Sequence, residues 1–123
     1  MADDDREVLE LVRTSLTNAG FEVVTAHDGV EALDIARKQQ FSLIILDVMI
    51  PYLDGYHVAA EISVNPQAAP VMLFTPRNFD SDGPAIQGSG AAAFLAKPFE
   101  ISELLGAIRG VLTEGKPKLR RRI

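Results

Sequence analysis

The sequence contains no cysteine, which excludes disulfide bonds and metal sites built from thiolates. It also lacks any apolar run near the roughly 20 residues that a membrane-spanning helix needs. Its first two residues are followed at once by three aspartates, which is not the pattern of a signal peptide. These absences predict a cytoplasmic protein with no membrane segment.

Basic side chains are scarce outside the last eight residues. Five of the 12 Lys and Arg residues lie in residues 116–123, which contain no acid. The other 7 basic and all 17 acidic residues give residues 1–115 a formal charge of −10. An acidic body argues against direct nucleic-acid binding and suits a site that holds a cation. We predict one domain over residues 1–115 and a basic C-terminal tail or linker over residues 116–123.

The chain does contain a regular alternation of helical and strand patterns. Apolar residues at helical spacing predict helices over residues 6–19, near 30–36, around 58–62 and over 101–112. Strands are predicted over residues 21–26, 42–47, 71–75 and 92–96. Strands separated by helices predict an α/β fold of three layers, with a parallel sheet and helices on both faces.

A polar residue stands at the end of three of these strands. Asp47 ends the second strand, Thr75 ends the third, and Lys97 follows the fourth. Because the carboxyl ends of parallel strands meet at one edge of the sheet, these side chains are expected to lie together. Taken singly, Thr75 also fits a β-branched strand residue and Lys97 a surface lysine.

Three consecutive acids, Asp3, Asp4 and Asp5, precede the first predicted helix. Acids at this place serve as caps and favour the helix dipole. If a short strand ended at Asp3, however, its carboxylate would converge on that of Asp47. Converging carboxylates repel each other unless a cation neutralises them, and oxygen ligands suit Mg²⁺.

Four motifs in this order resemble the response-regulator receiver domain of two-component signalling, the family that includes the chemotaxis response regulator. They are Asp3-Asp4, Asp47 with Pro51 and Gly55, Thr75, and Lys97-Pro98-Phe99. The resemblance covers residues 3–113. It implies a flavodoxin-like, doubly wound parallel sheet of strand order 2-1-3-4-5, an order taken from the family.

The resemblance implies that Asp47 is the phosphoacceptor, phosphorylated by a sensor histidine kinase or a phosphotransfer protein. It also implies an Mg²⁺ site. Asp4, Asp47 and the backbone carbonyl of Met49 would bind the ion directly, and Asp3 would bind it through water. Such a domain modifies itself and is not an enzyme in the usual sense.

The resemblance further assigns Thr75 and Lys97 to contacts with the phosphoryl oxygens. Thr75 and Phe94 would form a switch read by an output domain or partner protein. Phe94 also fits a core aromatic that only packs. The Lys97-Pro98 peptide bond is a candidate for the cis form.

The chain departs from the family at its first strand. Only Met1 and Ala2 precede the acidic pair, whereas a central strand should supply four to six apolar residues worth roughly 1.5–3 kcal/mol each. Either those residues are missing from the sequence, or another segment or a second copy in an intertwined dimer supplies them. The tail Lys118–Ile123 suits a central strand badly because it holds three consecutive arginines, so we expect a solvated linker.

A second departure lies after Thr75, where Pro76 and several Gly and Pro residues predict a short, shifted or mobile fourth helix. Three functions therefore remain. We favour a phosphoacceptor switch. The first alternative is a receiver-like interaction module that is not phosphorylated, because the shortened strand misplaces its acids. The second is a haloacid-dehalogenase-type phosphatase. Such enzymes have a second acid two positions after the nucleophilic aspartate, where this chain has Met49, and this speaks against that alternative.

Overall fold

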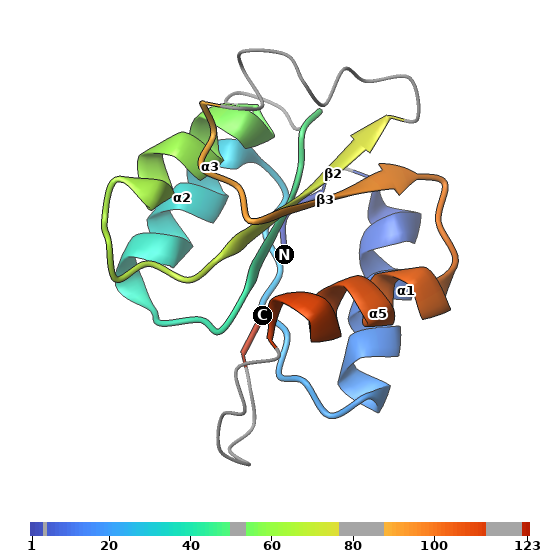
Figure 1. Ribbon diagram of the computed structural model, residues 1–123. Coiled ribbons are helices and arrows are strands. Elements are labelled where there is room, and N and C mark those ends of the chain that lie inside the picture. Colours follow the sequence, from blue (N-terminus) through green and yellow to red (C-terminus); the bar gives the residue numbers. More distant parts are fainter. Residues whose placement is uncertain (4, 50–53, 77–87, 113–121) are drawn as a thin grey trace.

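Buried apolar runs form the parallel strands at the centre of the molecule (Figure 1). The computed structural model describes residues 1–3, 5–49, 54–76, 88–112 and 122–123. Strand β1 (Ile44–Asp47) pairs with β2 (Val71–Pro76), which pairs with β3 (Ala93–Lys97), all in parallel. All four residues of β1 are buried, as expected for a strand covered on both faces.

Residues 1–3 lie between β1 and the segment 22–26. Ala2 forms a parallel bridge to Ala26 on one side and to Leu46 on the other. The Ala2 amide donates to the Ile45 carbonyl at 2.8 Å, and the Ala2 carbonyl accepts from the Asp47 amide at 3.0 Å. The order across the sheet is therefore 22–26, 1–3, β1, β2, β3, and the flavodoxin-like order 2-1-3-4-5 is confirmed.

The helices begin at acidic side chains that cap them. Helices α1 (Arg6–Asn18), α2 (Gly29–Lys38) and α3 (Gly55–Ser63) begin after Asp5, Asp28 and Asp54, which accept hydrogen bonds from first-turn amides. Helix α5 (Ile101–Val111) begins with a capping box between Glu100 and Glu103. After α1, Gly20 adopts φ +98, the left-handed conformation that glycine favours at this place.

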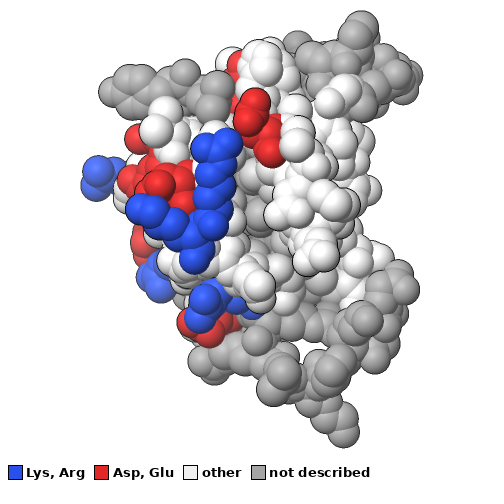
Figure 2. Space-filling model, turned by 90° about the vertical axis from the view of Figure 1, so that its left-hand side faces the viewer, with Lys and Arg blue, Asp and Glu red and all other residues white. Residues whose placement is uncertain are grey.

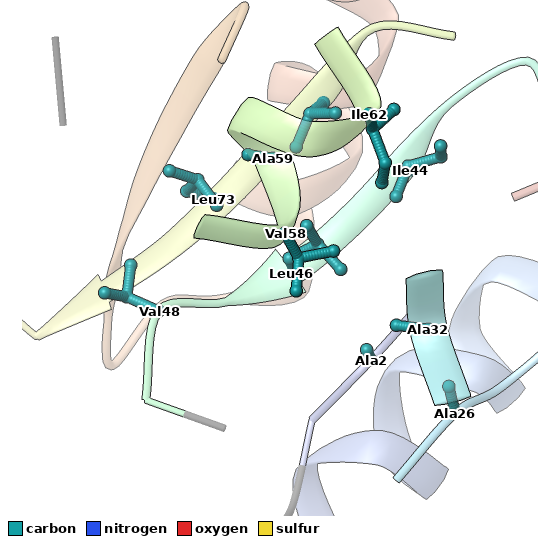
Figure 3. Close-up of a cluster of buried hydrophobic side chains, with 11 residues drawn as sticks. Ala2, Ala26, Ala32, Ile44, Leu46, Val48, Val58, Ala59, Ile62 and Leu73 are labelled. Carbon is teal, nitrogen blue, oxygen red and sulfur yellow. The ribbon is translucent and has the colours of Figure 1, made fainter. Parts of the chain in front are cut away.

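Two hydrophobic clusters hold the helices against the sheet, one on each face. Helices α2 and α3 cover one face, and helices α1 and α5 cover the other (Figure 1). In the first cluster, Val58, Ala59 and Ile62 of α3 lie over β1 and β2, while Ala2, Ala26 and Ala32 group together (Figure 3). The second cluster includes Leu9, Val12, Leu16, Leu104, Ile108 and Ile123.

The tail differs from the sequence-based expectation. Arg122 pairs with Glu22 in a parallel bridge, and the Ile123 side chain is fully buried. The expectation of a solvated tail is therefore wrong for Ile123. The Arg122 side chain is 39% exposed and donates to Glu22 at 3.1 Å and to Gln39 at 3.4 Å, so its charge is not buried.

The outer surface of α2 and α3 carries mixed charge. Figure 2 shows Lys and Arg side chains intermixed with Asp and Glu on this side of the molecule. The pairs are Arg37–Glu61 at 3.4 Å and Lys38–Asp34 at 3.1 Å. They are well exposed and so contribute little to stability. Within the described residues, no helix combines the length and apolar character that a membrane span requires. The predicted fourth helix, in the stretch after Pro76, falls outside those residues from residue 77 to 87.

Candidate functional site

Three charged side chains meet at the carboxyl edge of the sheet. Asp3 ends the segment 1–3 that pairs with β1, Asp47 ends β1, and Lys97 ends β3. The Lys97 ammonium donates to Asp3 Oδ2 at 3.0 Å and to Asp47 Oδ2. The Asp3 and Asp47 carboxylates therefore share the Lys97 ammonium. The positions of these residues at strand ends predict that they lie together, but not that one lysine contacts both acids.

Both carboxylates are withdrawn from solvent. Asp3 is 0% exposed and Asp47 is 5% exposed. Burial raises the pKa of Asp3 to about 6, and the charge of Asp47 adds to this, although hydrogen bonds from the Asp5 amide and Lys97 oppose it. Burial by itself would lower the pKa of Lys97, but its hydrogen bonds to Asp47 and Asp3 raise that pKa above the usual value. Within the part of the chain that the structure describes, the site thus brings together two buried acids and the Lys97 ammonium.

The turn after β1 fixes the Asp47 side chain. Asp47 Oδ1 accepts from the Met49 amide at 2.8 Å. The chain then returns at Gly55, whose amide donates to the Val48 carbonyl at 3.0 Å. A Cβ atom at Gly55 would clash with the Asp47 carbonyl and lie 2.9 Å from the Val48 Cα. Glycine is therefore required where α3 begins, because the backbone of β1 passes directly against it.

Thr75 and Phe94, predicted as the switch residues, lie on neighbouring strands. Thr75 is buried, at 6% exposure, and pairs with Ala96. Phe94 is 39% exposed on β3, so it is not the core aromatic of the alternative interpretation. The Lys97-Pro98 peptide bond is cis.

An aromatic contact beneath the site was missed at the sequence level. The Lys97 ammonium lies 5.9 Å from the centroid of the Phe74 ring, at a distance where a cation–π attraction operates. The Phe74 and Phe99 rings in turn lie 4.8 Å apart. In the sequence, Phe74 looks like an ordinary apolar residue of a buried strand. Nothing in the pattern around it, the neighbouring Thr75 included, indicates that Lys97, 23 positions later, lies over the Phe74 ring.

The donor set fits Mg²⁺. The described acids offer only carboxylate oxygens, which magnesium prefers, and their mutual repulsion favours an added cation. Asp3 and Asp47 are present at the site, and Met49 lies in the turn after β1 and lines the same hollow. Asp4 lies outside the described residues, and among those described no group of three His, Cys, Asp or Glu is gathered for a metal. The ligand roles of Asp3, Asp4, Asp47 and Met49 therefore all remain a prediction.

A hollow opens beside these side chains. It measures about 790 Å³ and lies between α1 and the segment that follows β3. Its walls include Asp47 and Lys97 together with the apolar residues Val8, Leu11 and Phe99. Although the Asp47 side chain is nearly buried, one side of the site is therefore reachable from outside.

Comparisons with known proteins agree with this geometry. The family model described as response regulator receiver domain matches residues 1–109. Response regulator MprA of Mycobacterium avium is 40% identical over 118 residues, covering 96% of this chain and 52% of that protein. MprA of Mycobacterium tuberculosis is equally similar, and the match covers 51% of its length. The chain thus spans about half the length of these curated relatives.

Solved structures of similar shape include chemotaxis response regulator CheY4 of Vibrio cholerae, with a TM-score of 0.83, 33% identity and coverage of 90% of this chain and 94% of that one. The receiver domain of sensor histidine kinase PA1611 from Pseudomonas aeruginosa, solved with magnesium in its active-site cleft, gives a TM-score of 0.82 at 26% identity, covering 92% and 94%. The motifs, the strand order and these matches together show that the chain belongs to the response regulator receiver domain family of two-component signalling.

Proposed function

We propose that this domain is a phosphoacceptor switch, and that Asp47 receives the phosphoryl group from a histidine kinase or a phosphotransfer protein. The observation that carries the proposal is the placement of Asp47. Its carboxylate stands at the carboxyl end of a buried strand, contacts Lys97, and borders an open hollow. An incoming phosphoryl donor would reach Asp47 through that hollow.

The transfer would proceed by attack of an Asp47 carboxylate oxygen on the phosphorus of a phosphohistidine. The P–O bond to Asp47 forms as the P–N bond breaks, and the imidazole leaves. Lys97 would then exchange its contact with the Asp47 carboxylate for one with a phosphoryl oxygen, and the Thr75 hydroxyl would contact another. This chemistry needs positioning and charge neutralisation more than proton transfer.

Magnesium would be held by Asp47, Asp4 and the Met49 carbonyl, with Asp3 acting through water. It would neutralise the charge that gathers as a phosphate enters a site with two buried acids. The added phosphoryl charge would in turn draw in Thr75 and reorient Phe94, whose exposed position on β3 suits a surface signal. An output domain or a separate partner would read that surface.

Acetyl phosphate tests the acceptor directly. With Mg²⁺ and acetyl phosphate, we expect the wild-type protein to gain about 80 Da by intact-mass spectrometry. Asp47→Asn should gain nothing, because the amide is not a nucleophile, and chelation of Mg²⁺ should suppress the gain in the wild type. Asp34→Asn is the matched control: Asp34 is an exposed acid paired with Lys38, so the variant should be modified as the wild type is.

Three results would count against this proposal. A wild-type protein that stays unmodified while folded would favour the receiver-like interaction module that is not phosphorylated. A gain of mass that persists in Asp47→Asn would assign the acceptor to another residue. Steady turnover of a generic phosphate ester, lost in Asp47→Asn, would instead indicate a phosphatase.

A further inference from the structure

Strand β2 lies between β1 and β3, the two strands that end in Asp47 and Lys97. Asp47 on β1 is the register partner of Phe74 on β2, and Phe74 is the register partner of Leu95 on β3. Lys97 stands two residues beyond Leu95, so it lies diagonal to Phe74 on the same face of the sheet. To reach Asp47, the Lys97 side chain must therefore cross β2 at the level of Phe74.

The packing of nearby residues identifies this face of the sheet. Phe74 belongs to the hydrophobic cluster beneath α1 and α5, and so does Ile45, two residues before Asp47. Leu95, two residues before Lys97, packs against the same cluster. Because side chains two positions apart in a strand share a face, Asp47, Phe74 and Lys97 all lie on the face covered by α1 and α5.

The Phe74 ring has little freedom to move. Its side chain is fully buried, and the Phe99 ring packs against it with centroids 4.8 Å apart and planes inclined by 51°. The Lys97 ammonium lies 5.9 Å from the Phe74 centroid. An aliphatic side chain could fill the same space, but only an aromatic ring presents a negatively polarised face to a cation. The ring therefore attracts the Lys97 ammonium from a fixed position.

The ring contact differs from the ion pair with Asp47 in one respect. If Lys97 exchanges the Asp47 carboxylate for a phosphoryl oxygen, that ion pair is lost during the transfer. The Phe74 ring takes no part in the exchange, so its contact with the ammonium can persist. The Lys97 side chain is 26% exposed and would otherwise be free to turn toward solvent. A lysine that is already extended across β2 loses less conformational entropy when the transition state forms.

We propose that Phe74 is a positioning residue, whose ring holds the Lys97 ammonium across β2 beside Asp47 and thereby speeds the transfer of a phosphoryl group to Asp47. The part of this proposal that concerns the speed of transfer rests on the proposed function. The part that concerns the placement of Lys97 does not.

Fluorination of the ring separates its charge distribution from its shape. Fluorine withdraws electron density from the ring face and changes the size of the side chain little, so a difluorinated phenylalanine in place of Phe74 should weaken the attraction and keep the packing. NMR relaxation should then show a clearly lower order parameter for the Lys97 Cε methylene. The same amino acid in place of Phe41, which packs against the other hydrophobic cluster, is the matched control and should leave Lys97 unchanged. An order parameter that stays the same with fluorinated Phe74 would overturn the proposal.

A double-mutant cycle gives an independent measure of the contact. Fluorinated Phe74 should lower the urea concentration at the midpoint of unfolding when Lys97 is present. It should not do so in the Lys97→Met background, because methionine has no charge for the ring to attract. Equal shifts in the two backgrounds would show that fluorination acts on packing alone, and would overturn the contact. If Lys97→Met does not fold, the relaxation measurement decides.

The rate of modification by acetyl phosphate tests the link to the site. With Mg²⁺ present, we expect the rate of mass gain to fall about threefold with fluorinated Phe74, and the protein with fluorinated Phe41 to match the wild type. An unchanged rate together with a lower Lys97 order parameter would overturn the effect on transfer and support the placement of Lys97. If none of the proteins gains mass, the proposed function is contradicted, and the order parameter still decides the placement.

Discussion

Gly55→Ala is expected to lower the free energy of unfolding by about 3 kcal/mol, a large share of the stability of a domain of this size. The added Cβ would clash with the Asp47 carbonyl and approach the Val48 Cα to 2.9 Å, and both are backbone atoms of the strand that carries the acceptor. A flexible side chain could rotate away, but a buried strand cannot. Chemical denaturation with urea measures the change.

Gly106→Ala is the matched control. Gly106 lies inside α5, and apart from its chain neighbours and the nearby backbone of its own helix, no atom of the described residues lies within 4 Å of the position that its Cβ would take. Alanine favours a helix interior over glycine, so this variant should gain about 0.5–1 kcal/mol. Since both changes add the same methyl group, their opposite signs would show that contact with Asp47 causes the loss. A Gly55→Ala protein as stable as the wild type would contradict the expected contact.

Lys97→Met is expected to have the second largest effect. Methionine keeps the unbranched shape but removes the cation that Asp3 and Asp47 share. Removing one partner of a buried ion pair costs about 3–5 kcal/mol. The Lys97 side chain is 26% exposed, so we expect the lower end of that range without Mg²⁺. Addition of Mg²⁺ should restore more stability to the variant than it adds to the wild type, because it replaces part of the lost positive charge.

Two further variants check the cause of that loss. Asp3→Asn in the Lys97→Met background should recover part of the stability, because one of the two repelling charges is gone. Lys38→Met removes a lysine from the exposed pair with Asp34 and should cost less than about 0.5 kcal/mol. Equal losses for Lys97→Met and Lys38→Met, measured by urea unfolding at the same ionic strength, would count against a buried three-charge cluster.

The sequence predicts most of the sheet and the meeting of Asp3, Asp47 and Lys97. Each of these residues follows or ends an apolar run, and the carboxyl ends of parallel strands lie at the same edge of the sheet, so the three side chains come together. Periodicity cannot predict contacts made by the backbone, such as the Met49 amide on Asp47. These depend on the path of a turn, and apolar patterns do not record that path.

The tail shows a different limit of sequence-based prediction. Three arginines in a row indicate a solvated segment, and for a whole central strand that argument holds. Of the tail residues that the structure describes, however, Arg122 pairs with Glu22 and Ile123 is buried, and the Arg122 side chain stays near the surface, where it bonds Glu22 and Gln39. Composition averaged over six residues hides the one isoleucine that is buried. A single apolar residue in a basic segment gives no periodic signal, so its burial cannot be predicted from the sequence pattern.

The pairing of Glu22 with Arg122 also has a consequence for the order of folding. Pairing Glu22 with Arg122 closes a loop of about 100 residues, whereas α1, α2 and the β1–β2 pair rest on much shorter separations. The entropy lost in closing a loop grows with its length, so the remaining sheet should assemble before Ile123 reaches its cluster. Until then, residues 1–3 would pair with β1 and with Ala26, but the bridge between Glu22 and Arg122 would not yet be formed. Arg122 and Ile123 are then expected to join the fold only after β1 and β2 have paired.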